Sequence, residues 1–137
     1  MQTTLDPYIS FRGNTRDAMQ FYQTVFGGKL EMNTFKDFHA SQEPGDDDLI
    51  MHAMLEADGI HFMAADTPLR MDYTGGTNIS MTLSGDNHAE LQAYFEKLAE
   101  GGSIREALVQ APWGDTFGMC VDKFGIVWMV NIAGPKA

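Results

Sequence analysis

Two stretches of the chain carry apolar residues at the three- and four-residue spacing of an amphipathic helix. The stripe of the first stretch consists of Ala18, Phe21, Tyr22, Val25 and Phe26. Asn14 precedes this stripe as a potential N-cap, and Gly27 follows it as a residue that ends helices. The pattern therefore predicts a helix that begins after Asn14 and ends at Gly27.

The second stretch repeats this arrangement in the other half of the chain. Its stripe consists of Leu91, Tyr94, Phe95 and Leu98. Asn87 stands before it with Glu90 three residues later, a spacing typical of a capping box, and Gly101 follows it. We expect a second helix between Asn87 and Gly101.

Strand-like segments surround both predicted helices in the same order. YISF (8–11) precedes the first helix, and KLEMNTF (29–35), LIMHAMLEA (49–57) and IHFMAA (60–65) follow it. NISMTL (78–83) precedes the second helix, and SIREALV (103–109), TFGMCV (116–121) and IVWMVN (126–131) follow it. The words GIHFM (59–63) and GIVWM (125–129) recur in corresponding places. The order βαβββ is therefore written twice, in modules of about 5–66 and 77–133.

Length and composition are those of one globular domain, which we expect to cover residues 1–137. The chain has 137 residues, of which 44% are hydrophobic and 20% are charged. Nine Lys and Arg against nineteen Asp and Glu give a net charge of -10, which repels nucleic acid and anionic lipid surfaces. The start of the chain lacks a signal-peptide pattern, and no apolar stretch reaches the ~18 residues that span a bilayer. We expect a soluble cytoplasmic protein that binds neither nucleic acid nor membranes.

Two further features favour structural roles. Cys120 is the single cysteine, so no intrachain disulfide can form, and its place in a strand-like segment predicts a buried, inert thiol. The acidic run EPGDDD (43–48) lacks the ligand spacing of a Ca²⁺ loop, so we expect a solvated loop there.

Three segments of the sequence, and the order in which they occur, resemble a known family. PYISFRGNTRDAMQFYQTVFGGKLE, MHAML and PWGDTFGMCVDKFGIVWMVN resemble the PhnB-like proteins, a branch of the vicinal oxygen chelate superfamily with glyoxalase I, bleomycin-resistance proteins and extradiol dioxygenases. The resemblance implies an α+β fold in which two βαβββ modules form an open sheet around a small-molecule cavity. It also implies a homodimer, because short open sheets leave strand edges and apolar surface that a second chain covers.

The family is often labelled a demethylubiquinone methyltransferase. The chain shows no doubly wound βαβ pattern and no glycine-rich first turn that would bind S-adenosylmethionine. We therefore give this label no weight.

The metal-dependent members of the superfamily would place His, Glu or Gln ligands at four positions. In this chain the resemblance puts those positions at or beside Pro7, and at Met63, Asn78 and Met129. None is a typical ligand, because thioethers suit soft Cu(I) and a lone amide oxygen binds weakly. We therefore expect a cavity with no metal and no cofactor.

Histidines supply the clearest candidate chemistry. His52 and His61 stand in strand-like segments, where each is either a hydrogen-bonded structural residue or a polar group of the binding site. Alternation places His61 on the same strand face as Met63, and Asp66 lies shortly after it.

Alternation also divides NISMTLS (78–84) into two faces. Ile79, Met81 and Leu83 are expected to pack under the helices, while Asn78, Ser80, Thr82 and Ser84 face either a cavity or solvent. Trp113 lies in a turn-like segment and is a candidate lid or pocket wall. The predicted ligand-binding residues are His52, His61, Met63, Asp66, Asn78, Ser80, Trp113 and Met129.

Two functional classes remain open. The first is a metal-free dimer that binds a hydrophobic or aromatic small molecule, as bleomycin-resistance proteins do. The second is a glyoxalase- or dioxygenase-type enzyme, which needs either metal ligands at other positions or acid–base work by His52 or His61 with Asp66 nearby. The absence of typical ligands at the four positions favours the first.

Overall fold

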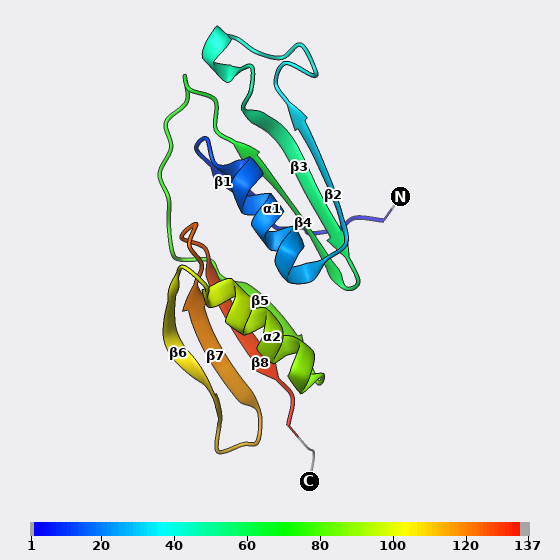
Figure 1. Cartoon of the computed structure of the whole chain (residues 1–137), viewed down its shortest axis with the longest axis vertical. Helices are drawn as coiled ribbons and strands as arrows, with labels where there is room; N and C mark the ends of the chain where they lie inside the picture. Colours follow the sequence, from blue (N-terminus) through cyan, green and yellow to red (C-terminus); the bar gives the residue numbers. More distant parts are fainter. Residues whose placement is uncertain (1, 135–137) are drawn as a thin grey trace. The chain divides into compact units, whose positions relative to one another are not determined.

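The computed structural model describes residues 2–134 of the chain. The chain divides into two compact units, unit 1 (Met1–Gly75) and unit 2 (Gly76–Ala137). Each unit contains one four-stranded sheet and one α-helix in the order βαβββ (Figure 1). The predicted α+β fold of two such modules is therefore confirmed. Among residues 2–134, no helix combines the length and apolar character needed to cross a membrane.

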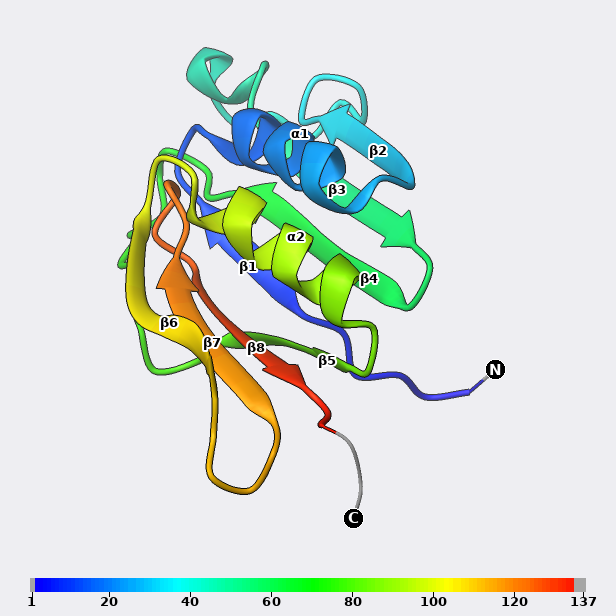
Figure 2. The ribbon, with the colours of Figure 1, turned by 60° about the horizontal axis from the view of Figure 1, so that its bottom comes forward.

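The sheet of unit 1 consists of one strand that precedes its helix in the sequence and three strands that follow it. Its elements are β1 (Tyr8–Phe11), α1 (Thr15–Phe26), β2 (Lys29–Thr34), the short 3₁₀ turn η1 (Pro44–Asp46), β3 (Ile50–Ala57) and β4 (Ile60–Asp66). The strand order is β1-β4-β3-β2, with β1 parallel to β4 and the other pairs antiparallel. Figure 2 shows α1 lying across one face of this sheet.

The core of unit 1 lies between α1 and the face of the sheet that α1 covers. Leu55 on β3 and Phe62 on β4 are register partners, and both are buried. The ring of Tyr22 on α1 packs edge-on against Phe62 at a centroid distance of 5.6 Å. Because side chains alternate along a strand, the residues between these buried ones point away from the helix.

A buried carboxylate fixes the start of α1. Asp66 Oδ1 accepts hydrogen bonds from the Gly13 and Thr15 backbone N–H groups and from Thr15 Oγ1, at 2.9, 3.1 and 2.7 Å. Its Oδ2 accepts a fourth bond, from the backbone N–H of Ile50 at 2.8 Å. Asn14 occupies the N-cap position but makes no side-chain capping bond, so the predicted cap is wrong. The carboxylate satisfies the helix N–H groups and joins α1 to β3 and β4.

Unit 2 repeats this architecture with its own elements. They are β5 (Met81–Gly85), α2 (His88–Ala99), β6 (Ser103–Gln110), β7 (Thr116–Val121) and β8 (Val127–Ile132). The strand order is β5-β8-β7-β6, and β5 is parallel to β8. Asn87 caps α2 as predicted, because its side chain accepts a bond from the Glu90 N–H at 3.1 Å.

The first strand of unit 2 is shorter than predicted. It begins at Met81, so Asn78 and Ser80 precede it, and Ile79 is 80% exposed instead of packed under the helix. The partner strand limits how far this one can extend: Met81 pairs with Trp128 and β8 begins at Val127, so Asn78 and Ile79 have no strand residue to pair with. A ladder cannot extend beyond the end of its partner strand, so local sequence preference did not decide this boundary.

Two other predictions for buried and exposed groups have different outcomes. Cys120 is buried as predicted, and burial, with a smaller effect of Asp122, raises the pKa of its thiol to about 11. The acidic run, in contrast, is not solvated throughout. Asp46 is buried, and its carboxylate accepts a bond from the Leu69 N–H at 3.1 Å, which anchors the loop.

We predict that Asp66→Asn destabilises the protein by about 2 to 3 kcal/mol, because an amide in this place leaves at least one buried N–H donor unsatisfied. Urea denaturation would measure the loss. Asp86→Asn, the same change at an exposed residue before α2, should stay within about 0.5 kcal/mol of the wild type. Equal stability of the two variants would show that Asp66 does not hold α1 in place.

Candidate functional site

One face of each sheet is not covered by the helix of its own unit. In unit 1 this helix-free face consists of side chains at alternate strand positions, opposite in direction to the buried ones. The helix-free face of unit 1 comprises Tyr8, Ser10, Lys29, Glu31, Asn33, His52, Met54, Glu56, His61, Met63 and Ala65. Most of these are half-buried or exposed, so the face can meet a ligand.

Thioethers and an aromatic ring form the apolar centre of this face. Met54 on β3 lies directly opposite Met63 on β4, and Tyr8 on β1 is the register partner of Met63 on its other side. The ring of Tyr8 approaches that of His52 at a centroid distance of 6.2 Å. Partial burial raises the pKa of the Tyr8 hydroxyl, so it remains protonated at neutral pH. Methionine side chains adapt their shape to a partner, which suits this surface to small molecules.

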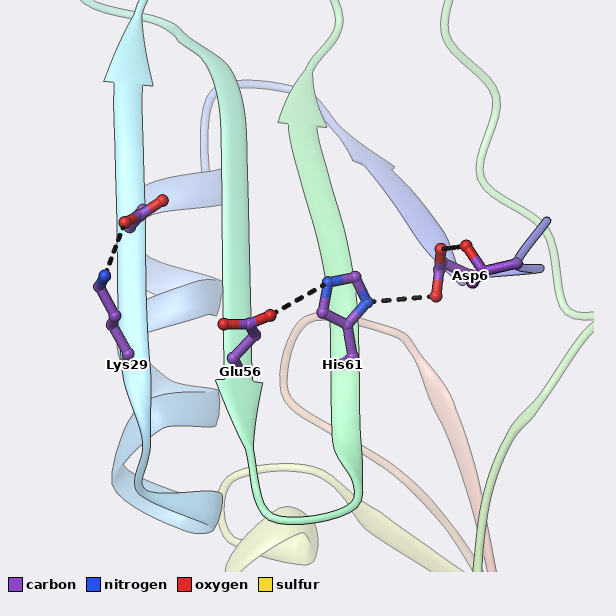
Figure 3. Close-up of polar contacts among 6 residues, drawn as sticks. Asp6, Lys29, Glu56 and His61 are labelled. Carbon is purple, nitrogen blue, oxygen red and sulfur yellow. Dashed lines mark hydrogen bonds and ion pairs between the residues drawn. The ribbon is translucent and has the colours of Figure 1, made fainter. Parts of the chain in front are cut away.

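A histidine between two carboxylates borders the apolar centre (Figure 3). His61 Nδ1 lies 3.2 Å from Asp6 Oδ1, and its Nε2 lies 3.8 Å from Glu56 Oε1. Asp6 is itself held in place, because its Oδ2 accepts a bond from Thr4 Oγ1 at 2.7 Å. The side chains of His61, Asp6 and Glu56 are 36%, 26% and 56% exposed. All three can therefore be reached from solvent.

A lysine–glutamate ion pair lies on β2, at the edge of the same face. Lys29 Nζ is 3.0 Å from Glu31 Oε1, and this hydrogen bond raises the pKa of the lysine. Lys29 is also the register partner of Glu56. Exposed pairs of this kind add little stability, but they set the charge of the surface. The face carries three carboxylates, with Asp6 included, and one lysine.

Unit 2 retains the thioethers on its helix-free face, with Glu106 beside Met119, but it lacks the histidine and its partner carboxylate. Met119 lies opposite Met129, and Thr82 is the register partner of Met129 on its other side. Val121 and Val127 pair with each other where unit 1 has Glu56 and His61. The duplicated modules thus share a methionine pair, and unit 1 alone adds a histidine with flanking carboxylates at these positions.

The structure brings together three of the predicted site residues, His52, His61 and Met63, on the helix-free face of unit 1. Met129 occupies the equivalent place in unit 2. Trp113 is exposed in the turn between β6 and β7. The binding roles of these residues, and of Asn78 and Ser80 before β5, stay predictions.

Asp66 does not lie on the helix-free face. It lies on the helix-covered side of β4, where it is buried and accepts four hydrogen bonds. We therefore assign it a structural role. Of the positions inferred for the superfamily ligands, Tyr8, the residue beside Pro7, is the register partner of Met63, and Thr82 instead of Asn78 is the register partner of Met129. Pro7 instead contributes its carbonyl, which accepts the Met63 N–H at 3.0 Å.

Sequence reasoning missed Asp6, Met54 and Glu56. Two of them could have been found, because Asp58-Gly59 is a favoured two-residue hairpin turn that places Glu56 opposite His61 and Met54 opposite Met63. Asp6 precedes the first strand and carries no pattern that connects it with a residue 55 positions away.

No group of three or more His, Cys, Asp and Glu side chains within residues 2–134 is arranged to hold a metal ion. The cluster around His61 fits this finding, because its two carboxylates approach different ring nitrogens and do not converge on one point. Typical catalytic metal sites require three convergent protein ligands.

Comparisons with known proteins give a consistent picture. A family model described as 3-demethylubiquinone-9 3-methyltransferase matches residues 3–131. Protein YjdN of Escherichia coli K12 is 32% identical over 141 residues, which cover 93% of this chain and 94% of YjdN. The crystal structure of PA1353 from Pseudomonas aeruginosa is 39% identical, with a TM-score of 0.82 over 96% of this chain and 98% of that one.

Two further structures extend the likeness. A PhnB protein from Bacillus cereus, which bears the same methyltransferase name, is 25% identical with a TM-score of 0.76, over 96% of this chain and 100% of that one. A glyoxylase/bleomycin resistance protein/dioxygenase domain from Frankia is 13% identical with a TM-score of 0.66, over 98% and 99% of the two chains. The second likeness concerns the fold alone, and it agrees with the fold expected from the sequence.

Proposed function

We propose a small-molecule-binding function for this chain, which belongs to the PhnB-like family described as 3-demethylubiquinone-9 3-methyltransferase, within the vicinal oxygen chelate superfamily. In this proposal the protein acts as a metal-free homodimer. The observation that carries the proposal is the helix-free face of unit 1, where Tyr8, Met54 and Met63 adjoin His52 and His61. Small-molecule sites typically combine apolar walls with a few polar groups in this way.

The topology gives no support to methyl transfer, in spite of the family name. Doubly wound folds bind nucleotide-like cofactors where the order of parallel strands reverses, beside a glycine-rich turn that opens a helix. Each sheet here has a single parallel pair, β1 with β4 or β5 with β8, and its other pairs are antiparallel. The binding reading therefore rests on the sheet face and not on the name.

A specific observation favours a second candidate function, acid–base catalysis by His61. Asp6 contacts Nδ1 and leaves Nε2 on the sheet face, as an orienting carboxylate does for a general base. The orienting residue is Asp6 and not Asp66, which is committed to α1. A reaction catalysed without metal and abolished by His61→Gln would support this candidate against pure binding.

We predict that Met63→Gln removes at least half of the thermal stabilisation that compounds from a screen give the wild type. The change places an amide in the apolar centre of the helix-free face, which lowers affinity for apolar groups at a half-buried position. Met71→Gln is the matched control, since Met71 is exposed outside the strands of unit 1. Equal stabilisation of both variants would place the binding site elsewhere.

Purified protein should contain well under one equivalent of Zn²⁺, Ni²⁺, Mn²⁺ or Fe²⁺. The reason is the chemistry of the side chains that are paired across the parallel strands. Tyr8 and Met63 in unit 1, and Thr82 and Met129 in unit 2, form no typical ligand set. Elemental analysis would measure the content. One equivalent of any of these metals, lost together with an activity on chelation, would move the assignment to a metal-dependent enzyme.

Light scattering after gel filtration should give about twice the chain mass of 15.2 kDa at micromolar concentration. The dimer is supported by β6, an eight-residue edge strand that exposes Ile104 and Val109. Long exposed edge strands with apolar side chains favour pairing with another chain. A mass near 15.2 kDa would contradict the dimer but would leave the binding proposal intact.

A further inference from the structure

The space between His61 and Glu56 has an unusual hydrogen-bonding character. Where His61 Nδ1 donates its proton to Asp6, Nε2 presents a lone pair toward the Glu56 carboxylate. The Nε2–Oε1 distance of 3.8 Å exceeds that of a hydrogen bond. Two acceptors that face each other across such a distance are satisfied by a group that donates at least two hydrogens.

Charge narrows the choice of donor. Asp6 and Glu56 flank His61, while the lysine of this face is paired with Glu31. The chain as a whole carries a net charge of -10. A surface of this sign attracts cations and repels anions, so an ammonium group fits better than a neutral amide or a hydroxyl.

The neighbouring row of side chains indicates what the ammonium is attached to. Tyr8, Met63 and Met54 lie two positions along the chain from Asp6, His61 and Glu56, respectively, and they form the adjoining part of the helix-free face. Aromatic and thioether side chains favour apolar and aromatic groups, and the face of a tyrosine ring also attracts cations. A molecule with an amine a few bonds from an aromatic ring would contact the polar pair with its amine and these three side chains with its ring.

We propose that the helix-free face of unit 1 binds the protonated amine of an aromatic small molecule. The ammonium group donates to His61 Nε2 and to the Glu56 carboxylate, and the aromatic part lies against Tyr8, Met54 and Met63. The inference rests on the proposed small-molecule-binding function and adds the ligand class. Unit 2 does not share it, because Val121 and Val127 replace the polar pair.

Three probes of similar shape test the ligand class: phenethylamine, phenethyl alcohol and hydrocinnamate, which are cationic, neutral and anionic. Each is titrated into the full chain by calorimetry at about pH 8, where alkylamines are charged. Phenethylamine should bind at least about tenfold more tightly than the alcohol, as one charge-assisted hydrogen bond implies. Hydrocinnamate should bind most weakly.

The Glu56→Gln variant separates the ammonium contact from general affinity. It should bring the affinity for phenethylamine to within about twofold of that for the alcohol, because the charge opposite the ammonium is gone. Its affinity for the alcohol should equal that of the wild type. Glu43→Gln, the same substitution at an exposed position outside the sheet, should retain the full preference.

Failure of the ligand class and failure of the binding function give different results. Equal affinity for the amine and the alcohol, with both weakened by Met63→Gln, would overturn the amine proposal and leave the binding function standing. Tightest binding of hydrocinnamate would also overturn it, since the face would then prefer an anion. If the wild type binds none of the three probes, the amine proposal is wrong, and the compound screen decides the binding function separately.

Discussion

One helix can cover only one face of a four-stranded sheet, and this constraint governs both units of the chain. Side chains alternate along every strand, so each strand residue belongs either to the covered face or to the helix-free face. Phe62 and Trp128 are buried on the covered faces, while Met63 and Met129 lie on the others. Each helix-free face must therefore meet something other than the helix of its own unit. The function proposed for the protein follows from that requirement.

The two modules solve a shared structural problem in different ways. A helix needs acceptors for its first backbone N–H groups. In α2 a residue next to the helix, Asn87, supplies one. In α1 the acceptor is Asp66 at the end of β4, and the equivalent residue at the end of β8 is Ile132. The duplication has therefore kept the architecture while the polar groups diverged.

The helix-free faces diverged in the same manner. Both keep a cross-strand methionine pair, which provides an adaptable apolar surface. Within residues 2–134, unit 1 alone adds a histidine whose two ring nitrogens face carboxylates from β3 and from the segment before β1. Ligand selectivity in this account comes from unit 1, and unit 2 contributes no charged group at the matching positions.

Local pattern predicted most of the fold, because helix stripes and strand alternation are properties of short segments. It placed His61 beside Met63 on one face, and it identified the capping residue of α2. It failed where the deciding partner is distant in sequence: Asp66 replaces Asn14 at α1 across 51 positions. The contact of Asp6 with His61 and the start of β5, set by β8, have the same cause. Such pairings depend on topology, which no short segment encodes.

The most direct measurement of the central claim uses labelled methionine methyl groups as NMR reporters while a stabilising compound is titrated. The account predicts shifts of the Met54 and Met63 signals and none for Met19, a buried residue of α1 on the opposite side of the sheet. Shifts confined to other methionines would contradict it.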